Sequence, residues 1–170
     1  PADRGWVDGH PVQEVIDHHR LRLMSKPNSE HVVIELDWAH RFDMMQQHTG
    51  QHVISALAQK HYGWSTLSFH LSVDSAFVVL ECDAAPPEAV QRLEDGVNEV
   101  IREAHDVQPR LATDADFSDR DIRCRKLPEV RSGGLRLVDI DGIDLNTCGG
   151  THVSNTCLLY TSDAADEASS

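Results

Sequence analysis

Two pairs of potential metal ligands, each with a spacing of four residues, constrain this sequence more than any other feature. The first pair is His48 and His52, and the second is Cys148 and His152. Because the pairs are remote from each other in the chain, a fold that uses both must bring two distant segments together. Three imidazoles and one thiol would then surround a single point.

The first pair lies in a segment with helical character, from Asp37 to about His61. Asp37 is a good N-cap residue, and Gly63 follows the segment as a typical helix-ending glycine. In a helix, residues i and i+4 stand one above the other, with Cβ atoms about 5–6 Å apart. His48 and the next histidine along this face can therefore bind one ion. A break near His48, giving two helices, is an alternative that the pattern leaves open.

Thiolate and imidazole together are ligands that Zn²⁺ prefers, in a tetrahedron of four. We therefore predict Zn²⁺ as the cofactor. Gly149 and Gly150 separate the second pair of ligands, where they allow a sharp bend and leave amide groups open to a substrate. The HExxH pattern of metalloproteases is absent, because Thr49 stands where that pattern requires Glu.

The role of the metal stays open at this point. Four protein ligands are typical of a closed, structural zinc site. Ligands from a helix and a remote glycine-rich loop, by contrast, favour a site at the junction of major elements, where water or substrate can enter. Both a structural and a catalytic zinc fit the pattern.

Strand and helix patterns alternate irregularly along the rest of the chain, which favours the α+β class. We expect mixed helices packed on an antiparallel-rich sheet, with the zinc site between a helix and a Gly-rich loop. The expected helix, besides the ligand helix, begins at Pro86-Pro87 and extends to residue 104. The expected strands cover residues 11–16, 31–36, 67–73, 76–82, 106–112 and 135–140.

Composition excludes several classes of protein. With 170 residues, 40% of them hydrophobic, the chain can bury a core. Its formal net charge of −13 argues against non-specific nucleic-acid binding, and we expect no DNA partner. No apolar run approaches the roughly 20 residues of a membrane helix. The four cysteines lack a disulfide spacing, which favours a reducing compartment and a cytoplasmic location.

The two ligand motifs, in this order and at this separation, resemble the paired zinc motifs of the alanyl-tRNA editing family. That family includes the AlaX proteins and the editing domain of alanyl-tRNA synthetase, and a related second additional domain occurs in threonyl-tRNA synthetase. The resemblance covers roughly residues 3–156. It includes Asp37-Trp38 before the ligand helix and Ser68-Phe69-His70-Leu71 after it.

The resemblance implies an aminoacyl-tRNA deacylase, a zinc-dependent ester hydrolase that removes serine or glycine from mischarged tRNA(Ala), in cis or in trans. Two other hypotheses remain. One is a non-catalytic module, stabilised by zinc, that binds tRNA or a protein. The other is a metal-dependent hydrolase of a small ester or amide that needs no RNA.

Residue roles follow from the resemblance and from the motifs. The metal ligands would be His48, His52, Cys148 and His152. The substrate-binding candidates are Gly149, Gly150 and Thr151, and the residues that could orient a ligand imidazole are Thr49 and Gln51. Basic residues are concentrated after residue 119, and the candidates there for contacting tRNA are Arg120, Arg123, Arg125, Lys126 and Arg131. An ordinary solvated surface explains this basic segment equally well.

The same resemblance divides the chain into three parts and suggests truncation at both ends. Residues 1–30 would be the remnant of an upstream β-barrel domain, and residues 31–156 the zinc-binding editing domain. Residues 157–170 change to a small, acidic composition and would be a non-native or disordered tail.

Overall fold

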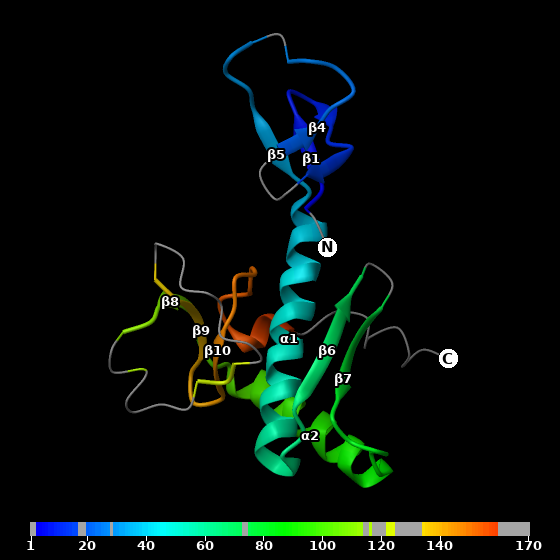
Figure 1. Ribbon diagram of the computed structural model, residues 1–170, viewed down its shortest axis with the longest axis vertical. Helices are drawn as coiled ribbons and strands as arrows, with labels where there is room; N and C mark the ends of the chain where they lie inside the picture. The colour runs from blue at the N-terminus through cyan, green and yellow to red at the C-terminus, as the bar shows by residue number, and fades with distance from the viewer. Residues whose placement is uncertain are drawn as a thin grey trace.

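The computed structural model describes residues 3–16, 20–27, 29–72, 75–113, 116, 122–124 and 134–159. Over these residues the fold is α+β, as expected, with two α-helices. The strands do not join into a single sheet. They form four small antiparallel sheets, of three, three, two and two strands. The expectation of one antiparallel-rich sheet was therefore wrong: the strands lie at the N-terminal end of the long ligand helix and on two of its sides (Figure 1).

The ligand helix α1 covers Trp38–Tyr62 without interruption, so the alternative of two helices is wrong. The Asp37 side chain accepts a hydrogen bond from the backbone N–H of His40 at 3.1 Å, which caps the first turn. Gly63 ends the helix with a left-handed φ of 69°, a conformation that glycine adopts without steric cost. Within the described residues, no helix is both long and apolar enough to cross a membrane.

Short strands gather at the N-terminal end of α1 (Figure 1). A tight turn joins the first two, with positive φ at both Asp8 (50°) and Gly9 (77°), as in type I′ hairpin turns. The three-stranded sheet has the order β2-β1-β5, and β3 pairs separately with β4. The bounds are Gly5–Val7 for β1, His10–Pro11 for β2, Glu14–Ile16 for β3, Arg20–Arg22 for β4 and Ile34–Leu36 for β5.

The remaining elements flank α1 on two sides (Figure 1). The hairpin of β6 and β7 lies on one side, and the sheet of order β10-β9-β8 lies on the other. In the sequence, α2 comes between the hairpin and this sheet. The bounds are Thr66–Leu71 for β6, Ala76–Leu80 for β7, Pro87–Glu103 for α2, Val107–Leu111 for β8, Arg136–Ile140 for β9, Asp144–Thr147 for β10 and Thr156–Leu159 for the 3₁₀-helix η1.

One apolar core joins both helices to the β10-β9-β8 sheet. Its buried members are Val53, Leu57, Ala58, Leu93, Val100, Val107, Val138 and Ile140. Gly142, with a φ of 70°, reverses the chain after β9 so that β10 runs back beside it. The loop after β10 is thereby directed towards the middle of α1.

We expect Leu57→Ala to lower the free energy of unfolding by about 2–5 kcal/mol, because it removes a buried leucine from this core. Leu57 is 6% exposed. Leu67→Ala is the matched control, since Leu67 is 55% exposed and its loss should cost about 0.5 kcal/mol or less. Urea unfolding at one fixed zinc concentration measures both. Equal losses for the two variants would contradict this description of the core.

Candidate metal centre

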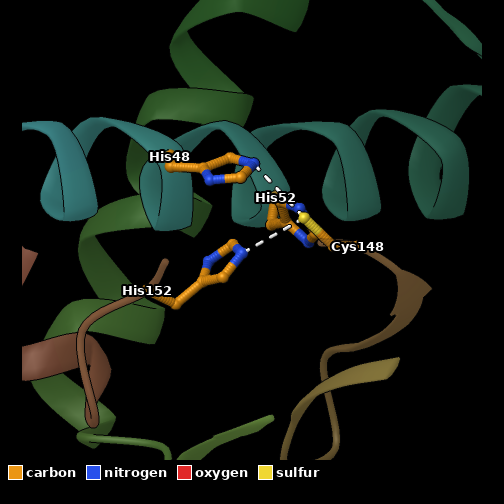
Figure 2. Close-up of side chains that lie close together, drawn as sticks. All are labelled: His48, His52, Cys148 and His152. Atoms are coloured by element: carbon orange, nitrogen blue, oxygen red, sulfur yellow. Dashed lines mark hydrogen bonds between the residues drawn. The ribbon is translucent and has the colours of Figure 1, made fainter. Parts of the chain in front are cut away.

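The four predicted ligands meet at one point. Each of His48, His52, Cys148 and His152 offers one ligand atom, and these atoms all lie within 4.8 Å of one another. Figure 2 shows the two histidines of α1 facing the cysteine and histidine of the loop after β10. The Cys148 sulfur lies 3.5 Å from Nε2 of His48 and 3.4 Å from Nε2 of His152. With usual Zn–N and Zn–S bond lengths, a tetrahedral site has an N···S edge of about 3.6 Å. The donor set and its spacing therefore fit zinc.

Two of the imidazoles are held through their other nitrogen. Nδ1 of His48 lies 3.3 Å from the carbonyl oxygen of Thr151. Nδ1 of His152 lies 3.1 Å from the hydroxyl of Thr49, and this hydroxyl also accepts the N–H of Val153 at 3.2 Å. When Nδ1 of a histidine is engaged in this way, Nε2 is left for a metal.

The third imidazole is held by a carboxylate. Nδ1 of His52 lies 3.2 Å from Oδ2 of Asp144, and both residues are buried. The guanidinium of Arg123 donates to the same carboxylate from Nε at 2.8 Å and from Nη2 at 2.6 Å. A carboxylate that orients a ligating histidine is a common outer partner of metal sites.

The electrostatic environment favours a thiolate. Burial raises the pKa of Cys148, but hydrogen bonds from His152, His48 and His52 outweigh it and lower the pKa to about 3. Burial lowers the pKa of His152 to about 4, which keeps this imidazole neutral. A thiolate and a neutral imidazole are the forms that bind metals.

The pKa values of His52 and of its partner Asp144 are shifted in opposite directions. Burial lowers the pKa of His52, but its bonds to Asp144 and Cys148 outweigh this and raise the pKa overall. Burial raises the pKa of Asp144, and the hydrogen bonds from Arg123 more than compensate, so that its pKa is lowered. Asp144 is therefore ionised at neutral pH.

The surroundings of Gly149 and Gly150 differ in how much room they leave for a side chain. Neither Gly149 nor Gly150 has a left-handed φ, so the sharp bend expected from the sequence is not what requires them. A Cβ at Gly150 would lie 2.3 Å from Cε1 of His48, whereas a Cβ at Gly149 would meet nothing within 4 Å. Gly150 leaves room for an imidazole, and Gly149 faces open space.

The site is buried on one side and open on the other. His52 is 3% exposed and His152 is 9% exposed. Gly149 and Thr151, in the loop between the thiol and the last imidazole, are exposed. On the hairpin side, the ring of Phe69 stacks on the His48 imidazole with centroids 5.8 Å apart. The loop between Cys148 and His152 therefore lies at the protein surface, next to the ligand cluster.

The other predicted site residues lie in different places. Thr49 contacts a ligand imidazole directly, as described above, whereas Gln51 donates to the Ser55 hydroxyl at 2.8 Å. Among the candidates for tRNA contact, Arg123 is committed to the Asp144 carboxylate. The other four, Arg120, Arg125, Lys126 and Arg131, lie outside the described residues.

Sequence reasoning did not find the role of Asp144 or the pairing of Arg123 with it. The available signal was an acidic residue between apolar neighbours, four positions before Cys148. Such a residue is a candidate partner for a ligating histidine. Its assignment to His52 depends on how β10 lies against α1, which local sequence does not define.

Comparisons with known proteins agree with the two motifs. Residues 135–159 match the family described as the threonyl and alanyl tRNA synthetase second additional domain. The chain is 38% identical to the alanyl-tRNA editing protein Aarsd1 of Danio rerio over 163 residues, which cover 94% of this chain and 40% of that protein. It is 31% identical to the alanyl-tRNA editing protein AlaX-L of Pyrococcus horikoshii over 169 residues, which cover 92% of this chain and 41% of that protein.

A third relative is an alanine–tRNA ligase of Metallosphaera sedula, 29% identical over 174 residues, which cover 91% of this chain and 19% of the ligase. Over residues 135–159 the chain is thus similar to the synthetase-associated additional domains. Along 92–94% of its own length it is similar to alanyl-tRNA editing proteins of the Aarsd1 and AlaX type. The resemblance drawn from the motifs is confirmed. The chain spans about 40% of the length of the Aarsd1 proteins that it matches.

We expect Gly150→Ala to weaken zinc binding by about 10-fold or more, because the added Cβ displaces the His48 ring and its Nδ1 contact. Gly149→Ala is the control and should bind zinc as the unchanged protein does. Competition with a coloured zinc chelator measures both affinities. Equal affinity of the two variants would show that the close approach at Gly150 is not needed.

The pKa of Cys148 predicts a thiolate that persists in acid. In the metal-free protein, the ultraviolet absorption of the Cys148 thiolate should be present at neutral pH, and the Cys148→Ser variant should lack it. It should disappear only as the pH falls through about 3, since protonation occurs below the pKa. A titration of the difference spectrum between the two proteins measures this. A midpoint near the ordinary thiol pKa of about 8.5 would contradict it.

Proposed function

We propose that this chain is the deacylating part of an alanyl-tRNA editing protein, and that it hydrolyses the ester of serine or glycine on mischarged tRNA(Ala). The observation that carries the proposal is the convergence of the two motifs. Four ligand atoms from α1 and from the loop after β10 lie within 4.8 Å of one another. Two relatives that are 38% and 31% identical to this chain over most of its length are named as alanyl-tRNA editing proteins.

The residues that would hold Zn²⁺ are His48, His52, Cys148 and His152. When bound, the ion would supply Lewis-acid polarisation of a carbonyl or water, or a point at which the amino acid or terminal ribose is held. The chain prepares for this by keeping its thiol deprotonated and His152 neutral.

Substrate contact is proposed on the open side of the site. The N–H of Gly150 is directed at the Cys148 sulfur, 3.4 Å away, so this amide supports the thiolate. Gly149 and Thr151 are exposed beside it, and we propose their backbone and hydroxyl groups as the contacts to the aminoacyl ester. For seryl discrimination, a buried group that hydrogen-bonds the substrate hydroxyl would be most effective.

We propose Arg120, Arg125, Lys126 and Arg131 as the contacts to the tRNA phosphates. The reasoning is electrostatic: phosphate binding requires cations, and this acidic chain concentrates its own in that segment. The proposed editing unit includes α1 and everything up to residue 156. Because β5 pairs with β1, residues 34–36 belong structurally with the N-terminal strands, so we propose that this unit starts at α1 and not at residue 31.

A second function, a zinc-stabilised module that binds without catalysis, is favoured by one observation. All four positions of a tetrahedral site are supplied by the protein, as in structural zinc sites. The two functions differ in whether bound Ser-tRNA(Ala) is released intact.

We expect the zinc-loaded protein to release serine from Ser-tRNA(Ala), and Cys148→Ala to lower the rate by about 100-fold or more, because it removes several kcal/mol of charge stabilisation. Cys157→Ala is the matched control, since Cys157 is exposed and stands outside the cluster. The measurement follows labelled serine with time. Tight binding of Ser-tRNA(Ala) without release of serine would support the binding module. Unchanged cleavage of small esters in excess tRNA would support a hydrolase that needs no RNA.

A further inference from the structure

A chain of three hydrogen-bonded side chains extends from the candidate metal centre into the protein. It begins at His52 on α1, continues through Asp144 on β10 and ends at Arg123, whose segment lies beside β10. Asp144 shares one oxygen between the two: Oδ2 lies 3.2 Å from Nδ1 of His52 and 2.6 Å from Nη2 of Arg123. Its second oxygen accepts from Nε of Arg123 at 2.8 Å.

We propose that Arg123 and Asp144 are positioning residues of the metal site, which orient His52 and set the charge around the metal. This assigns Arg123 to the metal centre in place of tRNA contact. The inference rests on the metal ligands proposed above, and it concerns metal affinity and not the reaction.

Geometry supports a role in orientation. The side chains of His52 and Asp144 are each 3% exposed, so neither is held by solvent. The planar guanidinium grips both carboxylate oxygens, which fixes the plane of the Asp144 side chain. That carboxylate in turn accepts the Nδ1–H of His52 and leaves Nε2 directed at the other ligands.

Charge supports the same role. A buried carboxylate without a cation would be costly. Arg123 supplies that cation permanently, because a guanidinium does not deprotonate in proteins. The guanidinium therefore balances the Asp144 carboxylate, which can stay buried and ionised beside His52.

Backbone contacts make this arrangement specific. The N–H of Arg123 donates to the carbonyl of Leu145 at 2.8 Å, and its carbonyl accepts from Thr147 at 3.4 Å. Arg123 is therefore anchored to the strand that carries Asp144 and leads directly to the Cys148 loop. Its side chain is 23% exposed, which leaves it mostly enclosed.

The chain contains a matched pair for the test. Arg110 grips Asp116 with two bonds, of 2.7 and 2.6 Å, and also contacts Asp139. The Asp116 side chain is 4% exposed, so this second arginine also pairs with a buried carboxylate. Among the described residues, its side-chain partners are Leu111, Asp116 and Asp139, and none of these is one of the four ligands. Loss of either arginine should reduce stability, but only one should affect the metal.

The experiment compares Arg123→Gln, Arg123→Lys, Asp144→Asn and Arg110→Gln in the full chain. Zinc affinity is measured by chelator competition, and the Tm of the metal-free protein is measured in parallel. We expect Arg123→Gln and Asp144→Asn to weaken zinc binding by about 10–100-fold. Arg123→Lys should recover part of the loss, because it restores the charge without the bidentate grip. Arg110→Gln should lower the Tm and leave zinc affinity unchanged.

Nuclear magnetic resonance of the zinc-loaded protein adds a readout of orientation. The Nδ1–H proton of His52 should exchange slowly with solvent in the unchanged protein and faster in Asp144→Asn. Equal zinc affinity in Arg123→Gln and the unchanged protein would overturn the inference, as would an equal loss in Arg110→Gln. If Arg123→Gln does not fold, the inference is overturned when the single variants Arg123→Lys and Asp144→Asn both keep full zinc affinity.

These outcomes are separable from the proposed function. An unchanged protein that binds no zinc would overturn the metal site and this inference together. A protein that binds zinc with the expected pattern among the variants but leaves Ser-tRNA(Ala) intact would overturn the proposed reaction alone.

Discussion

The contact between the middle of α1 and the loop after β10 is the interaction on which the candidate metal centre depends. Hydrogen bonds between protein groups form this contact. The Thr49 hydroxyl accepts the N–H of Val153 and is hydrogen-bonded to Nδ1 of His152. Thr49 is fully buried and Val153 is 1% exposed, so this contact is part of the packed interior. Folding therefore brings the ligands together, so the metal site is largely preorganised before a metal binds.

Charge inside this contact is balanced in two layers. At the centre, the Cys148 sulfur lies 3.5 Å from Nε2 of His48 and 3.4 Å from Nε2 of His152. Behind it, the Asp144 carboxylate is shared between an imidazole and the guanidinium of Arg123. Neither buried anion is left without a partner, which is the condition under which charges are tolerated in an interior. The loop between Cys148 and His152, by contrast, exposes Gly149 and Thr151 at the surface.

Several parts of the fold could be predicted because their causes are local. The caps of α1 at Asp37 and Gly63, and the turn at Asp8-Gly9, follow from the conformations that these residues favour. The division of the strands into four small sheets could not be predicted, because strand partners are chosen by long-range packing around α1. The close approach at Gly150 could not be predicted either, because the His48 imidazole that leaves no room for a side chain there comes from a distant segment.

By itself, the sequence determined the chemistry of the ligand set and the spacing within each pair. Four residues is the distance that places two side chains on one face of a helix, and thiol with imidazole is a set that suits zinc. Only the tertiary structure decided that the two pairs meet, and that Asp144 and Arg123 stand behind His52. The physical reason is that these contacts join residues far apart in the chain, so their geometry is set by how β10 packs against α1.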